Sequence, residues 1–158
     1  MFMAALILMV STGLFFFYLQ AACQKILRRQ FTQEFFQAIS KANRLEFPSV
    51  WKGIEDFDSP VEFPRLTLAL KCDFLTLTYL LKTTANFNQR NTYEERLLIV
   101  YFRLAFASLA ICHRVKVRET PVVLKLTAIL NYFANVVGER MNTVRSENLT
   151  ASEYRLTL

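Results

Sequence analysis

Glycine and proline are scarce in this chain of 158 residues, which contains three glycines and four prolines. Both counts lie below the average usage of globular domains. Tight turns rely on these two residue types, so their scarcity disfavours a sheet of many short strands and favours long helices. Three of the prolines, Pro48, Pro60 and Pro64, fall between residues 45 and 64. We therefore predict an all-α fold in which 45–64 is a connector.

Motifs for catalysis and metal binding are also lacking. The sequence has no phosphate-binding glycine loop, no GxSxG and no HExxH, and one histidine cannot supply the paired Glu-x-x-His motifs of a di-iron bundle. A catalytic site would have to use Cys72, Asp73, Cys112 and His113. Adjacent helix residues point about 100° apart, so Cys112 and His113 cannot act together as thiolate and base. We predict no catalytic residue, no metal site, no cofactor and no enzyme activity; a small cysteine-dependent enzyme is the alternative.

The three cysteines, Cys23, Cys72 and Cys112, are odd in number and widely spaced, and no CxxC occurs. This pattern is typical neither of a disulfide framework nor of a zinc site. We therefore expect free thiols, which fits a reducing compartment.

Charged side chains are absent from residues 1–24. About 20 apolar residues suffice to cross roughly 30 Å of hydrocarbon, and Tyr18 stands where an aromatic residue would meet the headgroups. A cleavable signal peptide would begin with a positively charged segment, which this sequence does not have. A lipoprotein signal ending at Cys23 would have an aliphatic residue where Gln20 stands. We predict an uncleaved transmembrane anchor over 1–24.

Basic residues follow the anchor directly: Lys25, Arg28 and Arg29. By the positive-inside rule, the N-terminus should lie outside the cell (inner) membrane and the rest of the chain in the cytoplasm. We expect these three residues, with Tyr18, to form the membrane interface and to contact anionic headgroups. The net charge is +6, but the other basic residues are scattered rather than set along one recognition helix, so we expect no nucleic-acid partner.

Residues 25–145 are predicted to form an antiparallel bundle of about four helices, followed by a polar tail over 146–158. Over 24–44, apolar residues recur at helical spacing without glycine or proline, which predicts a helix continuous with the anchor. The leucine-rich run over 64–87 fits a strand in part, but its length and its opening proline favour a helix.

The last two helices have clearer starts. Thr92 and Glu95 form a capping box ahead of the apolar run 97–112, and Thr120 precedes a proline that suits a first helical turn. The run 97–112 could also be a second membrane span in a multi-pass protein. It is short for that purpose and has Arg103 near its middle, a costly position in lipid.

Arg103 either reaches solvent, pairs with an acid inside the bundle or binds a partner subunit. A polar row on the last helix, which includes Asn131 and Asn135, is either a solvated surface or a seam between subunits. The predicted partner-binding residues are Phe31, Phe35, Arg103, Asn131 and Asn135.

The leading hypothesis is a non-catalytic, membrane-anchored accessory or scaffold subunit of a larger membrane protein complex. It rests on the anchor, on an aromatic-rich helical domain and on the lack of catalytic motifs. Energy-converting complexes, respiratory or photosynthetic, often contain such small subunits. The alternative is a self-associating membrane-anchored adaptor, in which Leu27, Phe31 and Phe35 pair two copies and the homo-oligomer recruits a cytosolic partner.

Overall fold

The computed structural model describes residues 2–29, 31, 34–50, 63–84, 92–116 and 119–156, with side chains described between 3 and 144. This part of the chain contains helices and no strand, which confirms the all-α prediction. Residues 47–50 form one further helical turn. The helices are α1 (Phe2–Leu27), α2 (Phe36–Ala42), α4 (Phe63–Thr84), α5 (Tyr93–Val115) and α6 (Thr120–Leu156).

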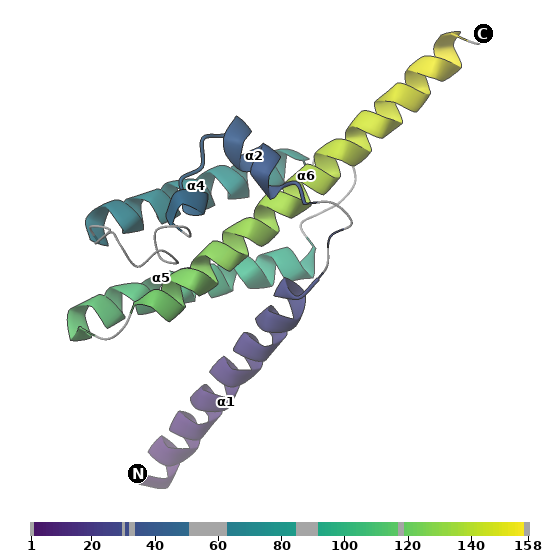
Figure 1. The fold of residues 1–158 in the computed structure, drawn as a ribbon. Coiled ribbons are helices and arrows are strands. Elements are labelled where there is room, and N and C mark those ends of the chain that lie inside the picture. Colours follow the sequence, from purple (N-terminus) through teal and green to yellow (C-terminus); the bar gives the residue numbers. More distant parts are fainter. Residues whose placement is uncertain are drawn as a thin grey trace.

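Helix α6 lies at the centre of the fold and contacts α1, α2, α4 and α5 (Figure 1). Several of its side chains between residues 123 and 137 are fully buried: Leu126, Ile129, Leu130, Phe133, Ala134 and Val137. Beyond the bundle, α6 continues as a single helix through most of the stretch predicted to be a polar tail.

Aromatic side chains join α4 to α5 beside this central helix. The rings of Phe74 and Phe102 stack with centroids 4.0 Å apart, and Phe74 also lies 6.4 Å from the ring of Phe133 on α6. Leu70, Leu77 and Leu98 are fully buried around them. The three helices therefore share one core.

Among the described residues, three helices rather than one are long and apolar enough to cross a membrane: Met3–Leu27, Tyr93–Val115 and Thr120–Val144. They differ in how much of their surface the rest of the protein covers. Most of α1 is exposed on every side, whereas most of the third segment is buried inside the bundle. The chain thus has the composition of a membrane protein. The number of spans depends on whether lipid or water surrounds the second segment, α5.

The prediction of a continuous helix over 24–44 is wrong. Helix α1 ends at Leu27, and α2 begins at Phe36. The cause lies on α6, where Oδ1 of Asn135 accepts hydrogen bonds from the backbone N–H groups of Phe35 (2.8 Å) and Phe36 (2.9 Å). A buried amide thus satisfies donors that the start of a helix leaves unpaired, so a new helix begins there.

Asp73 on α4 has a similar function for the chain after α2. Its Oδ2 accepts hydrogen bonds from the backbone N–H groups of Glu46 (2.9 Å) and Phe47 (2.7 Å), where the helical turn 47–50 begins. Burial raises the pKa of the Asp73 carboxyl, and the two N–H donors oppose that rise. Asn135 and Asp73 therefore fix the segment 34–50 against α6 and α4.

Gly138 allows the closest approach between this segment and α6. A Cβ atom at position 138 would clash with Cβ of Phe35 and lie 2.6 Å from its Cγ. These atoms are the rigid base of the phenylalanine side chain, so a larger residue could fit only if the backbones moved apart.

We expect Gly138→Ala to lower the thermal unfolding temperature of the detergent-solubilised protein, measured by circular dichroism. Overpacking costs about 1–3 kcal/mol, more than the roughly 1 kcal/mol that alanine gains in helix propensity. The matched control is Gly13→Ala in α1, where a Cβ would have no atom within 4 Å; this variant should unfold at the same temperature or higher. An unchanged unfolding temperature for Gly138→Ala would contradict the close approach.

Candidate functional site

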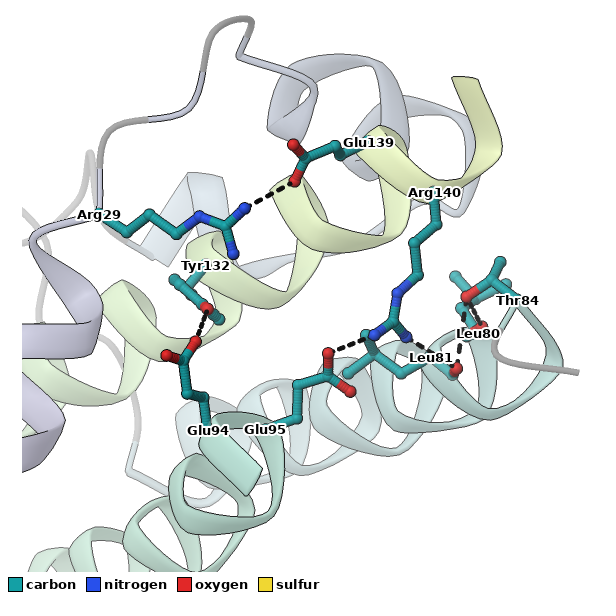
Figure 2. Close-up of polar contacts among 9 residues, drawn as sticks. All are labelled: Arg29, Leu80, Leu81, Thr84, Glu94, Glu95, Tyr132, Glu139 and Arg140. Carbon is teal, nitrogen blue, oxygen red and sulfur yellow. Dashed lines mark hydrogen bonds and ion pairs between the residues drawn. The ribbon is translucent and has the colours of Figure 1, made fainter. Parts of the chain in front are cut away.

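Charged and polar side chains gather where α1 and α4 end, α5 begins and α6 passes (Figure 2). We call this group the helix-end cluster; its members are Arg29, Glu94, Glu95, Tyr132, Glu139 and Arg140. Its residues come from two helices, α5 and α6, and from the chain just after α1. It therefore connects the end of α1 with α5 and α6.

The innermost contact of the helix-end cluster is the ion pair between Nη2 of Arg140 and Oε1 of Glu95. The two side chains are only 13% and 4% exposed. Nη1 of Arg140 also lies 3.5 Å from the carbonyl oxygen of Leu81, in the last turns of α4, where Oγ1 of Thr84 donates to the same oxygen. One guanidinium on α6 thus joins the start of α5 to the end of α4.

Thr92 is the residue before α5, as the capping box predicts, but it makes no side-chain capping hydrogen bond. Glu95 interacts with Thr92 and also pairs with Arg140, 45 residues further along the chain. The sequence signal located the start of the helix correctly. It did not reveal the ion pair, because nothing local in the sequence indicates that Arg140 faces Glu95.

The outer contacts of the helix-end cluster involve the chain after α1. Arg29 lies 3.5 Å from Glu139, and its guanidinium carbon lies 5.5 Å from the centre of the Phe31 ring. Phe31 meets Tyr132 edge to face at 5.4 Å, and the Tyr132 hydroxyl lies 3.5 Å from a carboxylate oxygen of Glu94. Each charged group in the cluster thus has a partner in the same chain, and the arrangement is suited to positioning the end of α1 on the bundle.

The residues considered for catalysis lie in separate places. Cys72 is exposed on α4, and Asp73 beside it is buried and bonded to backbone N–H groups. His113 stacks on Phe63 at 3.6 Å, and its Nδ1 lies 2.8 Å from Glu119. Phe63 is about 13 Å from Cys72 along the axis of α4, so His113, which stacks on Phe63, lies far from the Cys72 thiol. Among the described residues, no three His, Cys, Asp or Glu side chains group as metal ligands would.

The predicted partner-binding residues separate into two groups. Phe31 and Phe35 are half-buried against α6, and Asn135 is buried and receives a hydrogen bond from Phe35. Asn131 accepts a hydrogen bond from Asn135 (3.3 Å). Arg103, in contrast, is exposed on the outer side of α5. Their role in binding a partner stays a prediction, and Arg103 is the member best placed for it.

A second apolar face of α4 is exposed to solvent. Leu68, Leu75 and Tyr79 are 63%, 58% and 67% exposed, and Cys72 is exposed among them. We call these four residues the α4 stripe. Steps of four, three and four residues place them on one line, opposite the buried leucines of the same helix. The helical spacing of these residues is present in the sequence, but it does not show which face of the helix the rest of the chain covers.

The outer side of α5 contains exposed basic residues. Arg96, Arg103 and Arg114 are all exposed, and their spacing of seven and eleven residues places them within about 20° of one line. We call them the arginine line. Leu98, Phe102 and Leu109 are buried on the opposite side of the helix. The arginine line therefore points away from the bundle.

The predicted interface residues lie at the C-terminal end of α1, where this helix meets the bundle. Tyr18, Lys25, Arg28 and Arg29 are exposed, whereas Leu19 and Cys23 are buried by contact with the bundle. The boundary between the free and the packed part of α1 thus falls at residues 18–19.

The chain matches no protein-family model, no curated protein and no solved structure at a significant level.

We expect Arg140→Gln to destabilise the detergent-solubilised protein by about 3–5 kcal/mol in chemical unfolding, because it leaves the buried Glu95 carboxylate without its partner. Replacing both partners, Glu95→Leu with Arg140→Met, should restore most of the loss. The control is Arg29→Gln, which breaks a pair whose side chains are 50% and 46% exposed; it should cost less than about 1 kcal/mol. Equal costs for Arg140→Gln and Arg29→Gln would disprove the structural role of the inner pair.

Proposed function

We propose that this chain is a non-catalytic accessory or scaffold subunit of a larger membrane protein complex, anchored by α1 alone and with its bundle in the cytoplasm. The observation that carries the proposal is the α4 stripe, an apolar surface on the bundle that the chain itself leaves uncovered. Contiguous exposed apolar surface of this kind is typical of protein contact sites.

Single-pass anchoring is supported by the surfaces of the three apolar helices. Only 11% of the most apolar window of α1 is buried, against 67% for α6, so α6 finds its apolar environment inside the protein and α1 does not. If α5 crossed the membrane, the arginine line would turn three guanidinium groups toward lipid, one of them near the helix centre. Such a charge in hydrocarbon costs about 2.5–3.5 kcal/mol on insertion scales.

The charges around the α4 stripe indicate the chemistry of the partner. The stripe is flanked by Arg65, Lys71 and Lys82, which are exposed, while the one acidic residue of α4, Asp73, is buried. A second copy docking through α4 would bring cations of like sign together. The α4 stripe therefore suits an apolar helix of another subunit with acidic residues at its edges.

The self-associating adaptor is less well supported. It relies on Phe31 and Phe35 as a seam between two copies, and both side chains pack on α6 of their own chain. The residues left for contact with another molecule are mainly those of α4 and α5.

We expect the native protein, extracted in mild detergent, to elute from a sizing column in a complex larger than one chain of 18.4 kDa in its micelle. Leu75→Arg should release it from the complex, because it places a charge in the apolar contact. The control is Leu124→Arg, at a partly exposed position of α6 outside the α4 stripe. Elution as a lone chain would contradict the proposal. A dimer crosslinked by oxidation through Cys72 would favour self-association.

Orientation is tested by protease and a membrane-impermeant thiol reagent, both added to sealed right-side-out cells. Moving Lys25, Arg28 and Arg29 across the membrane is disfavoured by about 2.3 kcal/mol per charge per 100 mV. We expect residues 25–158 to survive and Cys72 to stay unmodified until denaturing detergent is added. Digestion of the domain in intact cells would reverse the topology.

A further inference from the structure

The arginine line is an unusual surface for a helix of this composition. Between its three arginines, the outer side of α5 presents only uncharged residues such as Val100, Ala107 and Ile111. Among the described residues, no carboxylate pairs with Arg96, Arg103 or Arg114. Three cations therefore lie along one side of the helix, and the first is about 27 Å from the last. The described residues supply no counter-charge to them.

This charged side of α5 faces the direction in which the anchor leaves the bundle. In Figure 1 the free part of α1 projects on the side of α5 that is turned away from α4. The buried side of α5 is turned toward α4, since Phe102 stacks on Phe74 at 4.0 Å. The arginine line is on the opposite side of α5, and it therefore faces the side on which α1 enters the membrane.

The arginine line also continues the basic end of the anchor. Lys25 and Arg28 are exposed at the end of α1, and α1 packs against α5. The first arginine of the line, Arg96, lies in the opening turns of α5, next to Glu94 and Glu95 of the helix-end cluster. Exposed basic residues thus lie both at the base of α1 and at three points along α5.

From this arrangement we propose that the arginine line binds anionic lipid headgroups, so that α5 lies flat on the membrane that α1 crosses. Guanidinium groups bind phosphate oxygens through paired hydrogen bonds, and each basic residue near an anionic leaflet contributes favourably to docking. The apolar residues between the arginines can sink to the level of the acyl chains, as in interfacial helices. The proposal requires α1 as anchor and does not require the partner that would bind the α4 stripe.

The test uses the full chain with Cys72 and Cys112 replaced by serine and Ala107→Cys labelled with an environment-sensitive dye. The labelled protein is reconstituted into vesicles of phosphatidylcholine, with or without phosphatidylglycerol. We expect a blue-shifted emission and quenching by spin-labelled lipid only when phosphatidylglycerol is present. About 1 M salt should abolish both signals, because the Debye length then falls to roughly 3 Å.

Two triple variants separate a specific surface from net charge. Changing Arg96, Arg103 and Arg114 to glutamine should weaken docking roughly a hundredfold and remove the lipid-dependent signal, whereas changing them to lysine should keep it. The control changes Arg65, Lys71 and Lys82 on α4 to glutamine, which removes the same charge from another face and should leave the signal intact.

Three results would overturn the proposal. The first is the same emission in neutral and anionic vesicles. The second is an equal loss of signal in the arginine and the α4 variants. The third is binding of labelled RNA in neutral vesicles that depends on the arginine line, without any response to phosphatidylglycerol; this result would assign the face to a nucleic acid. Because the α4 stripe is unchanged in the arginine variants, complex formation reports separately on the proposed function.

Discussion

The burial of α6 is the constraint on which the other elements depend. Its side chains between Val123 and Val137 point in several directions around the helix and are buried in most of them. No single neighbour can cover such a surface, so α4, α5, α2 and the end of α1 each cover a part of it. This explains why α6 has the composition of a membrane span and yet is enclosed by protein.

Buried polar groups then select one arrangement among those that apolar packing would allow. Apolar burial is not directional, so it does not by itself fix how far one helix slides along another. Asn135 bonds to the first N–H groups of α2, Asp73 bonds to the chain that follows α2, and Arg140 pairs with Glu95. Each of these contacts loses its partner if a helix shifts by one turn, and a buried group without a partner is costly.

The sequence was sufficient to predict an all-α fold and the starts of several helices, but not the contacts between helices or every helix end. The apolar run of α1, the start of α5 after Thr92 and the start of α6 at Thr120 all follow from local patterns and agree with the structure. The break after Leu27 does not, because its cause, Asn135, is 100 residues away from Phe35. The α4 stripe was hidden for another reason: helical spacing marks two apolar faces on this helix, and only packing shows which of them is covered.

The exposed length of α1 has a consequence for how the protein meets the bilayer. Residues 3–18 are exposed on all sides, while Leu19 and Cys23 pack against the bundle. The exposed stretch is about 24 Å long, and the hydrocarbon layer is about 30 Å thick. With α1 across the bilayer, the difference of about 6 Å is made up either by local thinning of the lipid or by the bundle sinking into it. In that arrangement the bundle would lie directly on the membrane, with the end of α1 and the start of α5 at the level of the headgroups.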